Sequence, residues 1–190
     1  MQKLVFSLAL ILSASAVKLD AGTIYAATLS GANEVAAVIT PATGSATLTL
    51  SGNSLQVTES FSGLIGGTAG AAHIHCCTAP GTNVGVAIPF TGFPSATSGT
   101  YSNTFDLTLT ATYLAAFLTN SGGTAAGAEA ALIAGLNAGT AYVNIHDTTF
   151  PGGEIRGLLV TVPETSSVML LGLGLLAMAM RRQLQRSVSK

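Results

Sequence analysis

The chain has 190 residues, of which 48% are hydrophobic and 8% charged. A typical soluble domain has about 25% charged residues, and disordered chains combine low hydrophobicity with high charge, so this composition excludes a disordered protein. Between Gly22 and Val162 the sequence has six acids but one cation, Arg156, which gives a net charge of −5. A nucleic-acid-binding protein needs a cationic surface to neutralise phosphates, so nucleic acid is excluded as a partner.

The first residues are typical of a secretory signal peptide. Lys3 provides a charged start, Leu4–Leu12 is an apolar run, and Ala14-Ser15-Ala16 fits a cleavage site, with Ala21 as a second candidate. We therefore predict that residues 1–21 direct export across the inner membrane. An uncleaved anchor is the alternative reading of the same run.

The C-terminal segment has three parts in order: a motif at Val162, Pro163 and Glu164, an apolar stretch at 166–180, and a basic patch of Arg181, Arg182 and Arg186. Its continuous apolar run has 13 residues. As a helix this run is about 20 Å long, against about 30 Å for the hydrocarbon core of a bilayer. The positive-inside rule keeps the arginines in the cytoplasm, so we expect a short transmembrane helix with the preceding domain outside the inner membrane.

This tail resembles the PEP-CTERM sorting signal of Gram-negative bacteria, in which a Pro-Glu motif, a short transmembrane helix and a basic patch follow one another. The motif here is Val162-Pro163-Glu164-Thr165, with threonine in place of the second proline of the family's commonest form. The resemblance implies an exosortase-type sorting protease as partner, a transient stay in the inner membrane and cleavage near Pro163-Glu164. The product is then a cell-surface or extracellular-matrix protein. An ordinary single-pass anchor is the alternative.

Alternation of apolar and polar residues predicts strands through most of the domain. The expected strands are at 46–50, 55–60, 105–110, 142–146 and 154–160. Ser51-Gly52-Asn53-Ser54 is a turn signal that joins the first two as a hairpin. Phe150-Pro151-Gly152-Gly153 lies between the last two.

Two stretches have helical spacing instead. Tyr113–Leu118 predicts a short helix, and Ala125–Asn137 predicts a longer one with Gly139 as its C-terminal cap. The stripe of the longer helix consists of Ala128, Leu132, Ile133 and Leu136. For residues 22–162 we therefore predict an all-β, Greek-key, immunoglobulin-like sandwich of about seven to nine strands with one short helical insertion.

All three histidines of the chain fall in two short strings, Ala71–Cys77 and Tyr142–Asp147. In a strand His73 and His75 point to the same face, and His146 joins them if its strand lies alongside. Imidazole is the commonest protein ligand for Zn or Cu(II), so these residues predict a metal site. The alternatives are histidines that bind loop backbone and lock two strands together, or acid–base catalysis. No nucleophile pairs with a histidine and an orienting acid, so we expect no enzyme.

Cys76 and Cys77 are neighbours in the sequence. Adjacent cysteines cannot form an ordinary bridge, and free thiols are a liability in an oxidising compartment. Three states stay open: a vicinal disulfide, soft metal ligands beside His75, and unpaired or intermolecular thiols.

Arg156 is interpreted as part of a structural ion pair. Glu154 lies two positions away, and Glu34 comes from the start of the domain. Such a pair joins the first and last strands, and removal of one partner of a buried pair costs several kcal/mol. An arginine that binds a ligand is the alternative.

Five strings of the domain resemble the CHRD domain, which is named for chordin, an extracellular antagonist of growth factors, and is widespread in bacteria. They come in the family order between Ile24 and Val160, at Ser30–Val35, Thr43–Ala46, Ala72–His75, Tyr142–His146 and Phe150–Gly157. The Pro-Gly-Gly-Glu-Ile-Arg-Gly string is the most specific. The resemblance implies an extracellular all-β module whose biochemical activity is not established. The chain departs from the family at Cys76-Cys77, where glycine is common, and in the long insertion from Ser121 to Asn137.

The sequence favours an exported surface or matrix module with a structural or partner-binding role. Exopolysaccharide or other surface proteins are the partners that we expect. A Zn- or Cu-binding protein is the second hypothesis. The His-x-His pattern on a Greek-key sandwich is analogous to Cu/Zn superoxide dismutase, although that enzyme type needs more than three histidines.

Overall fold

The computed structural model describes residues 22–163, 174–178 and 181. The predicted signal peptide, Glu164, Arg182, Arg186 and most of the predicted membrane helix at 166–180 lie outside the described residues. Residues 174–178 are helical. None of the helices in the described ranges has the length and apolar character needed to cross a membrane.

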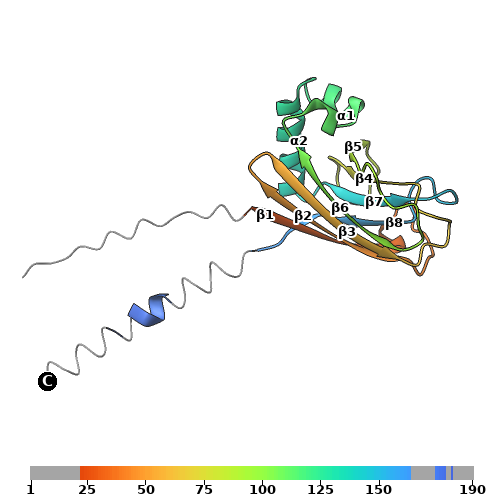
Figure 1. The fold of residues 1–190 in the computed structure, drawn as a ribbon, viewed down its shortest axis with the longest axis horizontal. Coiled ribbons are helices and arrows are strands. Elements are labelled where there is room, and N and C mark those ends of the chain that lie inside the picture. The colour runs from red at the N-terminus through yellow and green to blue at the C-terminus, as the bar shows by residue number, and fades with distance from the viewer. Residues whose placement is uncertain (1–21, 164–173, 179–180, 182–190) are drawn as a thin grey trace, which may run out of the picture.

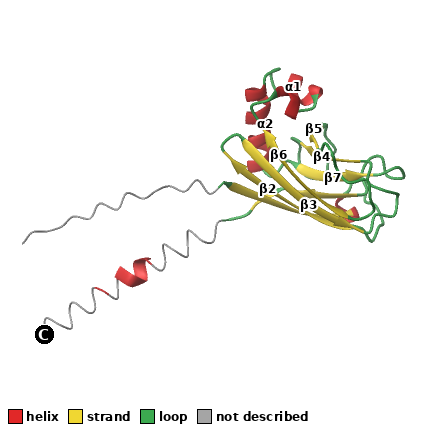
Figure 2. Cartoon of the chain, viewed as in Figure 1, coloured by secondary structure: helices red, strands yellow, loops and turns green. Residues whose placement is uncertain are grey.

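Nine strands form one continuous antiparallel sheet. They are β1 (Thr23–Ser30), β2 (Thr43–Ser51), β3 (Ser54–Ser62), β4 (Ala71–His75), β5 (Val86–Pro89), β6 (Gly99–Asp106), β7 (Tyr142–His146), β8 (Ile155–Leu158) and β9 (Val160–Thr161). The strand order is β5-β4-β7-β8-β1-β2-β3-β6, and β9 pairs with β1 (Figure 1). The number of strands agrees with the sequence prediction, but we expected two stacked Greek-key sheets and the structure has a single curled one (Figure 2).

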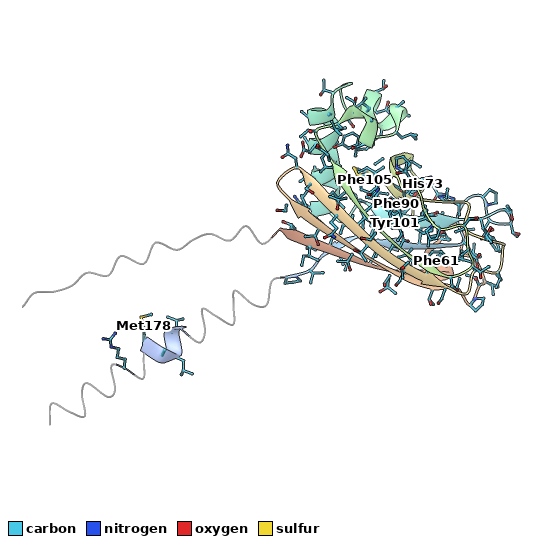
Figure 3. All side chains as sticks on the ribbon, in the orientation of Figure 1. Phe61, His73, Phe90, Tyr101, Phe105 and Met178 are labelled. Carbon is cyan, nitrogen blue, oxygen red and sulfur yellow. A yellow bond between two sulfur atoms is a disulfide. The ribbon has the colours of Figure 1, made fainter. Side chains whose placement is uncertain are left out.

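The curl of the sheet brings its two outermost strands together. Phe90 follows β5, and its ring stacks on Tyr101 of β6 with 5.2 Å between centroids and lies 6.0 Å from Phe105 (Figure 3). These aromatic residues belong to the same core cluster as Leu48 of β2 and Ile145 of β7. One core therefore fills the inside of the curl, and aromatic stacking closes it between the edges.

The predicted hairpin is present, with Ser51 opposite Ser54 and β2 and β3 in register along their length. Residues of β3 alternate strictly between buried and exposed, as the sequence pattern indicated. The strand predicted at 105–110 is wrong in its second half, because β6 ends at Asp106. The Asp106 carboxylate accepts hydrogen bonds from the amide and hydroxyl of Thr108, which turns the chain out of the sheet.

Helices α1 (Ala115–Asn120) and α2 (Ala125–Asn137) fill the connection from β6 to β7 and lie together at one end of the sheet (Figure 1). The bounds of α2 are those predicted. Thr124 caps its start by accepting a hydrogen bond from the Gly127 amide, and Gly139, at φ +66°, follows its end. Helix α1 begins two residues later than predicted, because Leu114 is still extended.

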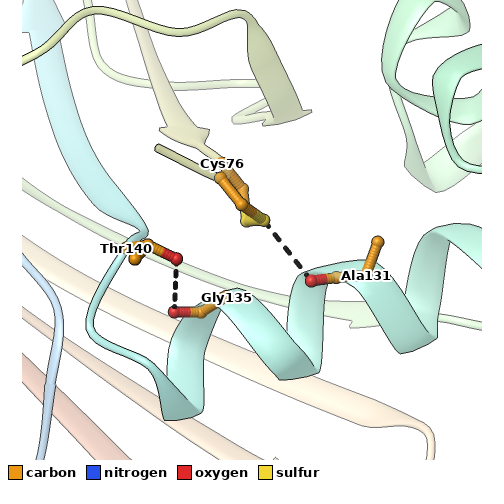
Figure 4. The surroundings of a disulfide bond; sticks show 5 residues. Cys76, Ala131, Gly135 and Thr140 are labelled. Atoms are coloured by element: carbon orange, nitrogen blue, oxygen red, sulfur yellow. Dashed lines mark hydrogen bonds between the residues drawn. A yellow bond between two sulfur atoms is a disulfide. The ribbon is translucent and has the colours of Figure 1, made fainter. Parts of the chain in front are cut away.

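A disulfide joins Cys76 to Cys77 and packs against α2 (Figure 4). The Cys77 sulfur lies 3.4 Å from the Ala131 carbonyl oxygen. Gly135 faces both sulfurs, and a β-carbon there would lie 2.3 Å from Cys76 Sγ and 2.4 Å from Cys77 Sγ. The absent side chain of Gly135 therefore lets the helix dock on the disulfide at the end of β4.

We predict that Gly135→Ala destabilises the fold by about 1–3 kcal/mol, because overpacking outweighs the gain of about 1 kcal/mol from replacing glycine in a helix. Urea unfolding curves measure the change. Gly85→Ala is the matched control, since a β-carbon at Gly85 meets no atom within 4 Å. A Gly135→Ala protein as stable as the native chain would contradict this packing.

Glu59 is an acid inside the core. It lies on the buried face of β3, between Ala46 and Tyr101 of the neighbouring strands, and is 1% exposed. Neither carboxyl oxygen has a hydrogen-bond partner among the described residues. Burial raises the pKa of Glu59 to about 8, so the side chain is protonated in the folded protein at neutral pH.

From this shift we predict that the contribution of Glu59 to the free energy of unfolding falls as the pH rises. The unfolded chain releases the Glu59 proton near pH 4.5 and the folded chain only near pH 8, so the loss spans that window at up to about 1.4 kcal/mol per pH unit. Glu59→Gln removes this slope, while Glu129→Gln on α2 keeps it. Denaturation at pH 5, 6.5 and 8 tests the expectation, and parallel curves for native and Glu59→Gln proteins would refute it.

Candidate metal site on a buried polar face

Strands β4, β7 and β8 have two different faces. Residues of one face, such as Ile74, Val143 and Ile155, enter the core. The opposite face is polar, and register sets its members side by side: His73 pairs with Asn144, and Asn144 pairs with Arg156. The members of this polar face are His73, His75, Tyr142, Asn144, His146 and Arg156.

Loops cover this polar face, so that Asn144 is 2% and Arg156 4% exposed. His75 Nδ1 lies 2.7 Å from the Val84 carbonyl oxygen, and His146 Nδ1 lies 3.0 Å from the Pro151 carbonyl oxygen. A carbonyl can only accept, so both rings carry their proton on Nδ1. The lone pair of each ring is therefore on Nε2.

The three predicted histidines come together. His73 lies 4.9 Å from His146 and 5.6 Å from His75 between ring centroids. One ring nitrogen from each lies within 4.8 Å of the others. His73 Nδ1, His75 Nε2 and His146 Nε2 are buried without a hydrogen-bond partner among the described residues.

The environment keeps these rings neutral. Burial lowers the pKa of His73 to about 4, and repulsion by His146 and His75 adds to the effect. Burial also lowers the pKa of His75 and of His146, although hydrogen bonds to Val84 and Pro151 oppose the shift. Neutral imidazole is the form that binds metals, so at neutral pH the cluster is ready to coordinate without releasing protons.

The donor set fits a transition-metal ion. Zn–N bonds of about 2.0–2.1 Å place two nitrogens of a tetrahedral site about 3.3 Å apart, so small rotations of the rings bring them into range. The backbone carbonyls that hold two of the Nδ1 atoms are the supporting contacts typical of metal-bound histidines. Cys76 and Cys77 form a disulfide, so they have no thiolate to offer to a metal ion beside His75.

Arg156 does not hydrogen-bond to Glu34 or Glu154, the partners that we predicted. Its Nε donates to the Asn33 carbonyl oxygen at 2.6 Å, its Nη1 donates to Asn83 Oδ1 at 2.8 Å, and its guanidinium carbon lies 4.5 Å from the Tyr142 ring centroid. Asn33 Nδ2 in turn donates to the Arg156 carbonyl oxygen. Arg156 thus joins the exit of β1 to β8, but through neutral oxygens.

Glu34 stays close enough to Arg156 to be affected by its charge. Burial raises the pKa of Glu34 to about 7, against the lowering effect of Arg156 and of the Val35 amide. Its Oε1 accepts a hydrogen bond from Asn144 Nδ2 at 2.9 Å. Gly153, at φ +124°, makes room for this contact, because a β-carbon there would lie 2.5 Å from Glu34 Oε1.

Glu154 turns away from Arg156 to a loop. Its carboxylate accepts hydrogen bonds from the Ile65 and Gly66 amides at 3.0–3.2 Å and from the Thr40 hydroxyl. Burial raises the pKa of Glu154, but hydrogen bonds from Asp147, Thr40 and the two amides outweigh it and lower the pKa overall. Burial and the neighbouring Glu154 carboxyl group raise the pKa of Asp147.

The predicted sorting motif begins at the end of the sheet, where the Val162 amide donates to the Ile24 carbonyl oxygen at 2.8 Å. Pro163 has no assigned secondary structure, and Arg181 is helical and exposed. The sequence reasoning missed Tyr142, Asn144 and Asn83 as parts of the site. Strand alternation could have found the first two, since they share a face with His146, but Asn83 lies in a loop without a pattern.

The sequence model of the CHRD domain family matches residues 25–159. This range runs from Tyr25 in β1 through β8 and includes α1, α2 and the histidine cluster. No curated protein and no solved structure matches the chain. CHRD domains are typical of extracellular and periplasmic proteins, in agreement with the family resemblance of the five strings. On this match, the chain belongs to the CHRD domain family.

Proposed function

We propose that this chain is an exported CHRD-domain protein that binds one Zn or Cu(II) ion through His73, His75 and His146. One observation carries the proposal: one ring nitrogen from each of the three histidines lies within 4.8 Å of the others, and each ring has a buried nitrogen without a hydrogen-bond partner among the described residues. The sequence favoured a structural surface module, with a metal-binding protein as the second hypothesis. We now propose the metal-binding protein first.

The buried nitrogens cost the fold free energy as long as they have no hydrogen-bond partner. An unpaired buried polar atom costs about 1–3 kcal/mol, and here three occur side by side. A cation coordinated by the lone pairs satisfies all of them at once and removes the mutual repulsion of the rings. When bound, such an ion supplies Lewis acidity or, for copper, electron transfer. The residues of this chain bind it, hold the rings in place and exclude water from one side.

A structural role of the histidines is the second candidate, and it has its own support. His75 and His146 each bind the backbone of a covering loop, at Val84 and Pro151. In that case the cluster locks the loops onto β4 and β7, and the module acts through its surface. The two roles differ in whether the protein binds a metal ion.

We predict that the untagged native protein takes up one Zn²⁺ or Cu²⁺ per chain, measured by elemental analysis after dialysis and by calorimetric titration. His73→Ala and His146→Ala each remove a ligand and are expected to weaken binding roughly a hundredfold or more. Gln56→Ala, on the exposed face of β3, is the control and retains full binding. A native protein that takes up no ion and folds unchanged would favour the structural role.

The same titration has a pH arm. Because burial holds the pKa of His73 near 4, protons compete little with the ion for this ring at pH 6, where most exposed histidines are protonated. The affinity is expected to be nearly constant from pH 8 to 6 and to fall towards pH 4. In the metal-free protein the rings protonate less readily than in the unfolded chain, so the contribution of the three histidines to stability falls as the pH drops below 6.5. An affinity already lost at pH 6.5 would contradict the neutral cluster.

Export and sorting belong to the same proposal. Membership of the CHRD family supports an extracytoplasmic place of action. The signal-like residues 1–21 and the motif at Val162, Pro163 and Glu164 then act as export and sorting signals, with an exosortase-type protease and transiently the inner membrane as partners. Exopolysaccharide or surface proteins are the partners proposed at the destination.

The sorting part predicts the mass of the mature protein. Cleavage near Pro163-Glu164 removes the basic patch Arg181, Arg182 and Arg186, so the intact mass of surface-extracted protein is expected to end before these residues. Replacing Pro163 and Glu164 with alanine is expected to leave the tail in place. A native surface form that still carries Arg181 and Arg182 would show an ordinary anchor instead.

A further inference from the structure

A second site lies beside the histidine cluster, on the other side of Tyr142. It is a pocket of about 220 Å³. Its lining consists of the loop Thr78–Thr82 together with Asn33, Tyr142, Arg156 and Leu158. A cavity of about 150 Å³ holds benzene, and drug-sized ligands need at least about 300 Å³, so a small organic molecule fits this pocket.

Arg156 brings unused hydrogen-bond donors into this pocket. A guanidinium has five N–H groups. The protein acceptors of Arg156 are the Asn33 carbonyl oxygen at Nε and Asn83 Oδ1 at Nη1. Nη2 has no acceptor among the described residues. It is also absent from the set of fully buried polar atoms that lack a partner, so it is accessible, and we place it in the pocket that Arg156 lines.

The charge of Arg156 is also incompletely balanced. Its two hydrogen-bond acceptors are neutral oxygens, and the Glu154 carboxylate instead accepts hydrogen bonds from the Ile65 and Gly66 amides. Glu34 is the carboxyl group that responds to Arg156, and its own hydrogen bond goes to Asn144. A charged guanidinium that is 4% exposed and partly unpaired needs an anionic partner in the pocket.

We propose that this pocket binds a small organic carboxylate, whose oxygens accept hydrogen bonds from Nη2 of Arg156. Arginine is the side chain best suited to carboxylate, because its planar fork can donate to both oxygens. The rest of the ligand lies against Ala79, Pro80 and Leu158. The Thr82 hydroxyl donates to the Ala79 carbonyl oxygen and accepts from the Thr78 hydroxyl, so both can only accept hydrogen bonds from the ligand. A free acid and an acidic sugar residue share this chemistry.

The pocket and the histidine cluster share one aromatic ring. Tyr142 stacks on His75 with 4.7 Å between centroids and 4° between planes, and Arg156 lies over Tyr142. The Tyr142 hydroxyl accepts a hydrogen bond from the Val84 amide, and the Val84 carbonyl oxygen is the partner of His75. Binding of the carboxylate does not require the metal ion, so the two sites can be tested separately.

The test is a titration of the isotope-labelled full chain, free of metal and chelator, followed by the amide signals of Thr78–Thr82 in NMR spectra. Sodium propionate and sodium glucuronate are the probes, and propionamide and glucose are their uncharged counterparts. For ligands of this size we expect dissociation constants of about millimolar order for both salts. The uncharged molecules are expected to bind at least about tenfold more weakly, because they lose a charge-assisted bond. If glucuronate binds with a dissociation constant of about millimolar order and propionate does not, the ligand is a sugar acid. If both salts bind in this range, the pocket accepts carboxylates in general.

Three variants keep the result interpretable. Ala79→Phe fills the pocket from an exposed position and leaves the Arg156 contacts intact, so it is expected to weaken both salts at least about tenfold. Ala116→Phe, at an exposed position of α1 that does not line the pocket, is the matched control and binds like the native chain. Arg156→Lys, checked for folding by its spectrum, keeps the charge but loses the fork and is expected to bind about tenfold more weakly.

Equal binding of charged and uncharged probes would overturn the proposal, as would native affinity in Ala79→Phe. The titration is repeated with His146→Ala, which lacks a proposed metal ligand. Carboxylate binding that persists there, whatever the outcome of the metal experiments, separates this site from the proposed metal site.

Discussion

The structure depends on the burial of a polar sheet face under loops. In most antiparallel sheets one face enters the core and the other meets water. Here β4, β7 and β8 have their second face covered by the segments around Asn33, Asn83 and Pro151. Every polar group beneath them must therefore find a partner, and the covering backbone supplies most of these partners. The groups that remain without one mark the places where the protein can take up something else.

The local parts of the fold could be predicted from sequence. The β2–β3 hairpin follows from strict alternation around a turn, and α2 follows from an apolar stripe between Thr124 and Gly139. The convergence of His73 and His75 follows from the period of a strand, and that of His146 follows once β7 lies beside β4. These features involve neighbours in the chain or a single strand pairing, which is the range over which residue patterns carry information.

The parts that depend on distant contacts were not predictable in the same way. The single curled sheet is closed by Phe90 and Tyr101 at its edges, and nothing in the alternation distinguishes that closure from two stacked sheets. Glu154 looked like a partner of Arg156 because it lies two positions away in the sequence. In the structure, however, Glu154 meets the amides of Ile65 and Gly66, which occur some ninety residues earlier. Opposite charges in a sequence do not show whether backbone donors compete for them.

The proposed metal site and carboxylate pocket are two consequences of one row of side chains. His75, Tyr142 and Arg156 stand one behind another, so that the ring of Tyr142 separates a cluster of neutral donors from a cation. This arrangement keeps a positive charge away from the imidazoles by the thickness of an aromatic ring, although Arg156 still contributes to the lowered pKa of His75. Loss of Tyr142 would therefore disturb both sides together.

The pairing of β1 with its neighbours also determines how far the site lies from the ends of the domain. Tyr25 pairs with Thr161, so the chain enters and leaves the sheet at one place. Ser30, at the other end of β1, is in the same transverse row as Arg156, Asn144 and His73. Five residues of extended strand separate these two rows, or about 17 Å. The row that holds His73 is thus set apart from the two ends of the domain by most of the length of β1.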